Sequence, residues 1–153
     1  MIDLRIMEQK VVLREEFVKR RAALDKEYKA KADAKVAASL LSLPEYARAK
    51  SVLFYLSMRQ EVDTGAIVQK QLLLDEFVLV PFMQRDNLAI GRITSLDDVQ
   101  PAHYGVLEPK EKTPVDVPLD VVITPGLAFA KNGARLGFGK ANYDRFFAFR
   151  KVG

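Results

Sequence analysis

The spacing of apolar residues divides this chain into segments that alternate between helix and strand. Residues 3–21 carry Leu13 and Phe17 four positions apart on one stripe, which predicts an amphipathic helix. A second helix, rich in alanine, lysine and leucine, is expected over residues 25–43. A short third helix should follow over residues 44–49, because its first residue is a proline, which helix starts favour.

Apolar and β-branched runs mark the strands. Residues 51–57 are apolar enough to be covered on both faces of a sheet, and residues 77–83 form a second strand with Pro81 near its end. Residues 88–93 alternate as a hairpin or edge strand does. Between the first two runs, residues 63–74 predict a helix with a capping residue at its start. This alternation indicates an α/β class fold, a three-layer α/β/α Rossmann-like arrangement with a largely parallel sheet. The length of 153 residues fits a single domain over 1–153.

The last part of the chain contains the stretch expected to organise the function. Residues 94–118 include four prolines and are predicted to form loops. A strand is expected over 121–129, followed by a polar, glycine-rich loop over 130–142 and an aromatic, basic helix that reaches Lys151. Ligands of open α/β sheets bind beyond the carboxyl ends of the strands, so this loop and the 57–61 loop should share one rim.

The glycine-rich loop has the features of a phosphate-binding site. Gly137 and Gly139 lack a Cβ, so the backbone can take positive φ and let an anion approach several N–H groups. Arg135 and Lys140 supply cations, and the start of the next helix adds free N–H groups and the positive end of its dipole. The same residues also fit an ordinary strand–turn–helix connection capped by Asn142. The loop alone leaves both interpretations open.

Composition narrows the classes of protein and site. With 49% apolar and 29% charged residues, the chain is typical of a folded globular protein. No apolar run approaches the ~18 residues of a membrane-spanning helix and no signal peptide is visible, so we expect a cytoplasmic protein without a membrane partner. The absence of cysteine excludes disulfides and thiolate sites. A single histidine, His103, argues against a catalytic triad or a multi-histidine metal site.

The net charge of +4 is distributed unevenly along the chain. Residues 1–50 hold 12 Lys/Arg against 8 Asp/Glu, residues 51–118 hold 6 against 10, and residues 119–153 hold 6 against 2. If the first helix packs near the glycine-rich loop, two basic segments meet and would attract phosphates. Lys10 and Arg14 lie four residues apart, so they can bind one anion from one helix face. The alternatives are a solvated pair of cations and a basic helix that binds nucleic acid without a recognised motif.

Several longer motifs run through the chain. They are an opening K-x-x-L-R, a Y-x-S-x-x-x-E-V-D-T element from Tyr55, a G-x-L-E-P piece from Gly105, and P-G-L-A-F followed by R-L-G-F-G-K-A-N-Y-D-R from Pro125. Together they resemble the signature of the 5-formyltetrahydrofolate cyclo-ligase family, also called methenyltetrahydrofolate synthetases. The family usually has glycine at Ala141 and tyrosine at Asn142, so this chain departs from the pattern within the loop itself.

The resemblance implies an enzyme of folate one-carbon metabolism with two small-molecule substrates, ATP and 5-formyltetrahydrofolate, and no nucleic-acid partner. In the family, ATP bound with Mg2+ phosphorylates the formyl oxygen, N10 attacks the activated carbon, and phosphate leaves to give 5,10-methenyltetrahydrofolate. A formamide oxygen is a poor leaving group and phosphate is a good one, which explains the use of ATP. The alternative interpretation is a catalytically impaired relative that still binds nucleotide or folate.

The resemblance also implies roles for individual residues. The residues expected to bind ATP come from the two basic segments: Lys10, Arg14, Arg135, Gly137, Gly139, Lys140 and Tyr143. Those expected to contact folate are Leu56, Glu61 and Phe138. The carboxylate of Glu61 suits this task because it can accept paired hydrogen bonds from pterin N–H groups. Asp144 would be a ligand of Mg2+, and Lys140 and Arg145 would be the catalytic residues that stabilise charge on the phosphates.

Two departures from the family affect the expected structure. Ala141 adds a methyl group where the family has glycine, and a positive φ there would cost on the order of 1 kcal/mol. Family members also continue for several dozen residues past the Y-D-R helix, so this chain is predicted to lack the C-terminal strands. The sheet would then end in an unpaired strand over 121–129, which a second copy could cover in a homodimer.

Overall fold

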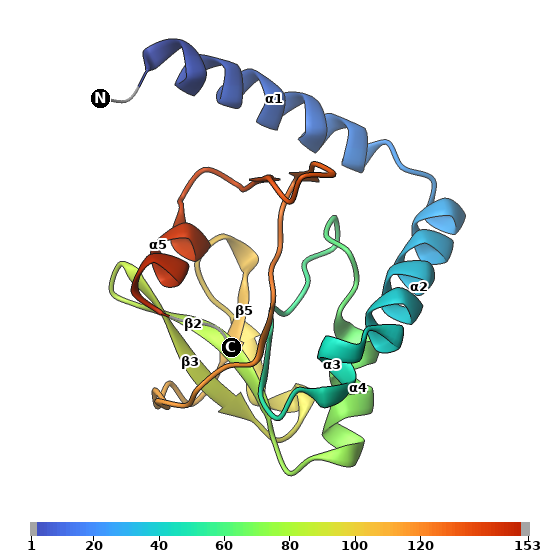
Figure 1. The fold of residues 1–153 in the computed structure, drawn as a ribbon, viewed down its shortest axis with the longest axis vertical. Coiled ribbons are helices and arrows are strands. Elements are labelled where there is room, and N and C mark those ends of the chain that lie inside the picture. The colour runs from blue at the N-terminus through green and yellow to red at the C-terminus, as the bar shows by residue number, and fades with distance from the viewer. Residues whose placement is uncertain (1–2, 151–153) are drawn as a thin grey trace.

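Three helices open the chain (Figure 1). The computed structural model describes residues 3–150, and Lys151 lies outside the described part. The helices are α1 (Leu4–Ala22), α2 (Lys26–Ser42) and α3 (Pro44–Arg48). Asp3 and Asp25 cap the first two, because the carboxylate of Asp3 accepts one hydrogen bond, and that of Asp25 two, from free backbone N–H groups of the first turn. These bounds closely confirm the three predicted helices. None of the helices within residues 3–150 combines the length and the apolar character needed to cross a membrane.

The central sheet has four strands in the order β3-β2-β1-β6. They are β1 (Val52–Phe54), β2 (Val78–Gln84), β3 (Asn87–Ile93) and β6 (Val121–Ile123). β1 runs parallel to both neighbours, with Leu53 paired to Leu79 of β2 and to Val122 of β6. β3 is antiparallel to β2 and forms the predicted hairpin. Helix α4 (Gly65–Leu74) lies between β1 and β2 in the chain, as parallel strands require, so the largely parallel sheet is confirmed.

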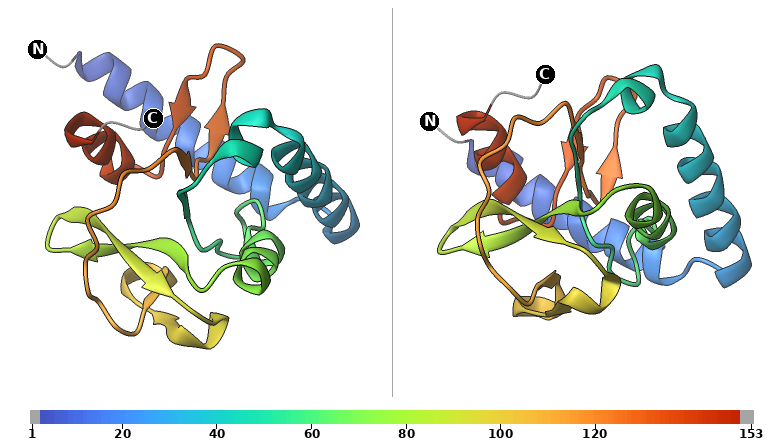
Figure 2. Two further views of the ribbon diagram at one scale, coloured as in Figure 1. Left: turned by 60° about the horizontal axis from the view of Figure 1, so that its bottom comes forward. Right: turned by 90° about the horizontal axis from the view of Figure 1, so that it is seen from below.

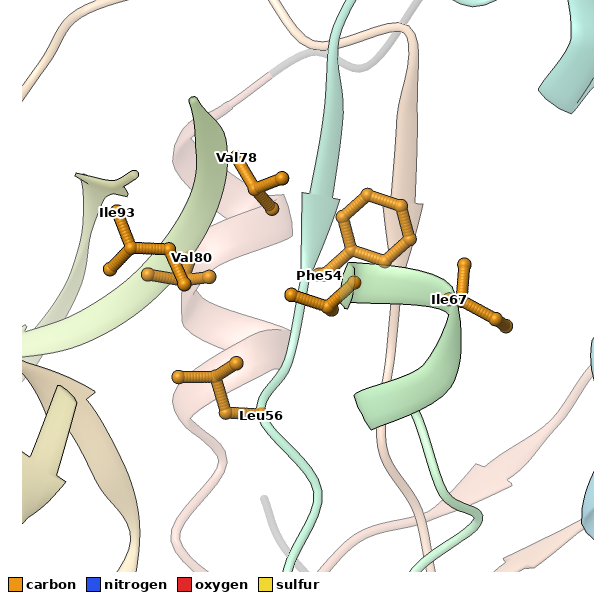
Figure 3. Packing of buried hydrophobic residues seen from close by; sticks show 7 residues of the cluster. Phe54, Leu56, Ile67, Val78, Val80 and Ile93 are labelled. Atoms are coloured by element: carbon orange, nitrogen blue, oxygen red, sulfur yellow. The ribbon is translucent and has the colours of Figure 1, made fainter. Parts of the chain in front are cut away.

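Helices cover both faces of this sheet and complete three layers. Because side chains of a strand alternate in direction, Phe54 of β1 points to one face, where it packs with Ile67 of α4 and with residues of α2 and α3 (Figure 3). Leu53 points to the other face and forms a second cluster with Phe146 of α5 (Asn142–Phe149). The expected α/β/α arrangement is therefore present, and α5 packs on the face of the sheet opposite to α4.

The segment 94–118, predicted to be loop, contains regular structure. It comprises η1 (Leu96–Asp98), β4 (Val99–Pro101), η2 (His103–Gly105) and β5 (Leu107–Pro109). β4 and β5 pair as an antiparallel ribbon, while His103 is exposed, as expected for a surface residue. The prediction missed the ribbon because each of its strands has only 3 residues and ends in proline.

Glu108 fastens this ribbon to the sheet. Its side chain is buried; Oε1 accepts a hydrogen bond from the backbone N–H of Met83 at 2.9 Å, and Oε2 pairs with Nζ of Lys112 at 2.7 Å. A buried carboxylate needs such partners, because an unpaired buried charge is costly. The ribbon is thereby fixed against β2, and with it the preceding turn that contains Tyr104.

The strand predicted over 121–129 is interrupted after Ile123. The following residues form a separate hairpin of β7 (Ala128–Phe129) and β8 (Arg135–Leu136). Pro125 has no N–H to donate to a strand ladder, which disfavours continued pairing. Gly126 follows it and is closely covered, since a Cβ there would lie 2.8 Å from the ring of Phe129. β6 is the last strand in the order, so within residues 3–150 the expected unpaired edge is present.

Candidate active site

Helix α1 lies across the end of the molecule that carries the β7–β8 hairpin and the glycine-rich loop (Figure 1, Figure 2). Nε of Arg14 donates a hydrogen bond to the carbonyl oxygen of Gly137 at 3.0 Å. This contact confirms that the first helix meets the loop. Lys10 lies one turn before Arg14 on the same helix face, and its side chain is exposed.

Arg14, Phe17 and Arg21 form the face by which α1 contacts the rest of the chain. They are the half-buried residues of this helix, all of which is described, and none of its residues is fully buried. Arg21 donates hydrogen bonds to three backbone carbonyl oxygens, those of Gln60, Gly126 and Leu127. Sequence reasoning missed Arg21, because one more basic residue in a helix rich in lysine and arginine carries no signal of its own.

Gly139 uses the conformational freedom expected of the loop. Its φ is 103°, a value that glycine adopts without strain. A Cβ at this position would lie 3.6 Å from Cζ of Arg14, so the guanidinium rests against nearly bare backbone. Gly137 is not among the residues with positive φ, contrary to expectation; a Cβ there would instead lie 3.1 Å from Nη1 of Arg135. The two glycines thus leave room for two different arginines around one loop.

The residues at which the chain departs from the family pattern begin α5. Ala141 is the N-cap and adopts the left-handed conformation, with φ 54° and ψ 24°. The capping role considered for Asn142 is wrong, since its Oδ1 accepts a hydrogen bond from Arg145 at 2.7 Å instead. The N-cap residue Ala141 makes no side-chain capping hydrogen bond, so the N–H groups of the first turn of α5 are open to an anion.

Ala141→Gly is expected to stabilise the chain by about 1 kcal/mol, because alanine is strained in the left-handed region and glycine is not. The free energy of unfolding, measured by urea titration, checks this. Ala148→Gly is a matched control with the opposite sign, since Ala148 lies inside α5, where glycine costs about 1 kcal/mol. A loss of stability in Ala141→Gly would contradict the assigned strain.

Arg135 links the loop to α5. Its Nη1 donates a hydrogen bond to the carbonyl oxygen of Pro125 at 3.0 Å, and its Nη2 pairs with Oδ1 of Asp144 at 2.9 Å. The guanidinium also lies over the ring of Tyr143, 5.8 Å from the centroid. The side chain of Asp144 is 75% exposed. Residues 3–150 contain no cluster of three or more His, Cys, Asp or Glu side chains that could hold a metal.

Glu61 is a buried carboxylate beside two tyrosines. It is 7% exposed, and its Oε1 accepts a hydrogen bond from the backbone N–H of Met58 at 2.8 Å. Burial raises the pKa of Glu61, while the Met58 N–H and the charge of Arg21 oppose the rise. Burial also raises the pKa of Tyr55 and of Tyr143, and the charge of Glu61 adds to both shifts. The charge of Glu61 thus acts on Tyr143 in the first turn of α5.

The two other residues expected to contact folate lie in different settings. Leu56 is buried in the core cluster with Phe54 and Ile67, so its side chain serves packing and its backbone is what remains for a ligand. Phe138 is exposed in the glycine-rich loop, next to Gly139. Its ring is accessible to a ligand.

Lys140 and Arg145, the predicted catalytic residues, have partners within the chain. Nζ of Lys140 lies 3.4 Å from the ring centroid of Tyr104, which is 79% exposed. Arg145 donates hydrogen bonds to the carbonyl oxygens of Lys140 and Asp86 at 2.7 and 2.9 Å, so it braces the loop against the β2–β3 turn. Sequence reasoning missed Tyr104; its signal was the G-x-L-E-P motif that begins at the next residue.

Comparison with protein families decides how this arrangement is classified. The model of the 5-formyltetrahydrofolate cyclo-ligase family matches residues 6–152, nearly the whole chain. The chain belongs to the 5-formyltetrahydrofolate cyclo-ligase family. The match includes all but the first two residues of α1, the Glu61 loop and the glycine-rich loop, so the segments brought together in the structure lie within the cyclo-ligase pattern.

Individual cyclo-ligases show the same likeness. A probable 5-formyltetrahydrofolate cyclo-ligase of Caenorhabditis elegans is 30% identical over a match that covers 67% of this chain and 55% of the relative. The 5-formyltetrahydrofolate cyclo-ligase of Haemophilus influenzae is 31% identical, with 87% and 74% covered. This chain therefore spans little more than half of the first relative and about three-quarters of the second.

A solved structure confirms the fold. The NMR structure of Aquifex aeolicus 5,10-methenyltetrahydrofolate synthetase superposes with a TM-score of 0.78 at 30% sequence identity, covering 94% of this chain and 74% of that one. The α/β fold predicted from the sequence is thus that of a cyclo-ligase.

Proposed function

We propose that this chain catalyses the ATP-dependent conversion of 5-formyltetrahydrofolate to 5,10-methenyltetrahydrofolate. The hydrogen bond between Arg14 and Gly137 carries the proposal, because it brings the cations of α1 onto the glycine-rich loop at the uncapped start of α5. Such an arrangement is complementary to a triphosphate. Membership of the cyclo-ligase family and the names of the relatives support the same reaction.

In this proposal ATP lies between α1 and the glycine-rich loop. Lys10 and Arg14 supply positive charge from the helix, and the backbone around Gly139 supplies N–H groups that an anion can approach. Three further residues proposed to bind ATP shape the loop through the contacts described above. They are Gly137, Arg135 and Tyr143. The phosphates are thereby aligned for transfer before the reaction begins.

Lys140 is proposed to stabilise the charge on the transferred phosphate. Its contact with the exposed ring of Tyr104 is worth only about 1 kcal/mol, so a phosphate competes with it readily. Arg145 holds the carbonyl oxygen of Lys140 and thus positions the residue that acts. Of the two predicted catalytic residues, we assign the electrostatic role to Lys140 and a supporting role to Arg145.

The folate substrate is proposed to bind at Glu61. A buried carboxylate with a raised pKa, held by one backbone N–H, has acceptor capacity left for the paired N–H groups of a pterin. Phe138 and the backbone at Leu56 would contact the same ligand. Because the charge of Glu61 acts on Tyr143, we propose that the folate and the nucleotide lie side by side.

Mg2+ is proposed to bind at Asp144 together with the phosphates. One exposed carboxylate fits this ion, which keeps several waters and takes one or two carboxylates plus phosphate oxygens. Asp144 would leave the ion pair with Arg135 to do so, which frees that guanidinium for the nucleotide. Bound there, the ion would neutralise charge on the phosphates.

A spectrophotometric assay tests the proposed function. The absorbance of methenyltetrahydrofolate is expected to grow only when 5-formyltetrahydrofolate, ATP and Mg2+ are all present. Calorimetric titration with each ligand accompanies the assay. Tight binding without turnover would select the catalytically impaired relative, and absence of binding would refute the proposal altogether.

We also propose that a second copy of the chain covers the free edge of the sheet. An apolar groove of about 150 Å³ lies beside β6, with Val36, Ile67, Ile123 and Phe129 in its lining. Unpaired strand edges readily pair with a strand of another chain. Sedimentation equilibrium should show a dimer, and a monomer at all concentrations would exclude it.

A cytoplasmic location stays a prediction, which cell fractionation tests.

A further inference from the structure

Arg21, in the last turn of α1, spreads its guanidinium over backbone carbonyls of two loops. Nε donates to the oxygen of Leu127 at 3.0 Å and Nη2 to that of Gly126 at 2.6 Å. Nη1 donates to the oxygen of Gln60 at 3.1 Å, in the other loop. All three guanidinium nitrogens are therefore engaged, and each bond is assisted by the positive charge.

The acceptors belong to the two loops that follow neighbouring parallel strands. Gln60 directly precedes Glu61 in the loop after β1, while Gly126 and Leu127 lie in the P-G-L-A-F segment after β6. Arg21 thus ties α1 to both loops at once. It lies two helical turns after Arg14, on the same face.

These bonds matter because α1 buries little apolar surface, with Phe17 as its one half-buried apolar residue. None of its residues is fully buried, and its half-buried face consists of Arg14, Phe17 and Arg21. Because packing of an apolar face supplies most of the stability of a docked helix, a helix with so little of it depends more on its specific hydrogen bonds. The position of Arg14 over the glycine-rich loop therefore depends on Arg21 at the other end of the same face.

We infer that Arg21 is a positioning residue. It fixes α1, which carries the cations proposed to bind ATP, relative to the loop that carries Glu61. It is not among the residues proposed to contact either ligand and acts through residues that are, so the inference rests on the proposed function. Lysine cannot replace it, because an ammonium on a flexible stem lacks the planar fork that reaches three carbonyls.

The electrostatics of the loop agree with this role. The charge of Arg21 lowers the pKa of Glu61 and of Tyr55, against the larger effect of burial in each case. Arg21 thus helps to keep Glu61 ionised as an acceptor while fixing the backbone beside it. One guanidinium supports the proposed folate acceptor in both charge and position.

Steady-state kinetics of Arg21→Gln and Arg21→Lys, beside Arg20→Gln, test the inference. Both Arg21 variants should raise KM for ATP and for 5-formyltetrahydrofolate about tenfold or more, with a smaller change in kcat. Arg20 is the matched control: it is mostly exposed, pairs with Glu16 on its own helix, and should leave both KM values within about twofold. If Arg21 serves only stability, KM stays unchanged while the active fraction falls, and that result would overturn the inference.

Hydrogen exchange of the ligand-free proteins separates this inference from the proposed function. Arg21→Gln should speed amide exchange in the 57–61 and 126–127 loops and in α1, while Arg20→Gln should not. A wild-type chain without turnover would refute the proposed activity and leave this readout in place. Equal exchange in the two variants would refute the role of Arg21 whatever the activity.

Discussion

Glu61→Gln is expected to lower kcat/KM for 5-formyltetrahydrofolate by about 100-fold, the effect of losing hydrogen bonds to a charged acceptor. Glutamine keeps the shape of the side chain and can still accept the bond from Met58 N–H. It has no charge, however, and turns an amide NH2 toward the N–H groups of the pterin, where two donors would meet. KM for ATP should change little. Initial rates at varied concentrations of each substrate measure the contrast.

The same substitution should make the folded chain more stable at neutral pH. Burial raises the pKa of Glu61 above its ordinary value of 4.5, so the folded chain binds this proton more tightly than the unfolded chain does. The stabilisation is complete below the unfolded pKa and is lost as the pH rises through the folded pKa. Above that pH the buried charge is a cost, and glutamine does not carry it.

Urea unfolding at about pH 5 and about pH 8 should therefore show that the stability advantage of Glu61→Gln grows with pH. Glu76→Gln, at an exposed position, is the control and should change neither stability nor kinetics. Unchanged folate kinetics in Glu61→Gln would remove this carboxylate from the substrate site. A lower stability at pH 8 would show that ionised Glu61 gains more from its surroundings than it loses by burial.

The helices were predictable because their signals are local. Asp3 and Asp25 precede apolar or alanine-rich runs and accept the N–H bonds expected of capping residues, and Pro44 begins α3. The parallel core strands were predictable for a related reason, since apolar runs bounded by polar turns mark buried strands. Their lengths were overestimated, as in β1, because periodicity shows that a segment is buried and not how many residues pair.

Features that depend on partners far along the chain could not be predicted. The ribbon forms only when the short strands β4 and β5 pair with each other, and Glu108 gains its partners only after folding. Arg21 donates hydrogen bonds to backbone carbonyl oxygens, which every residue has, so no sequence motif predicts which of them it contacts. The glycine-rich loop was predicted through its composition, whereas the use of positive φ at Gly139 and not at Gly137 depended on where two arginines lie.

Arg14→Ala is expected to raise KM for ATP by about 100-fold while KM for 5-formyltetrahydrofolate changes far less. The substitution removes a cation from the proposed phosphate site and breaks the bond that docks the middle of α1 on Gly137. The loop that bears Glu61 stays in place, because Arg21 still holds Gln60. This selectivity distinguishes Arg14 from Arg21, whose loss should weaken the binding of both substrates.

The measurement is a pair of KM values for each variant, with calorimetric titration of ATP as an independent check. Lys19→Ala removes the same charge from an exposed position on α1 and should leave both KM values near those of the wild type. Arg14→Lys should recover part of the ATP affinity, because it restores the charge without the fork that bonds the Gly137 oxygen. Equal effects of Arg14→Ala on the two KM values would mean that Arg14 positions the loops of both proposed substrate sites. No effect on ATP would mean that the triphosphate binds elsewhere, and the proposed site would fail with it.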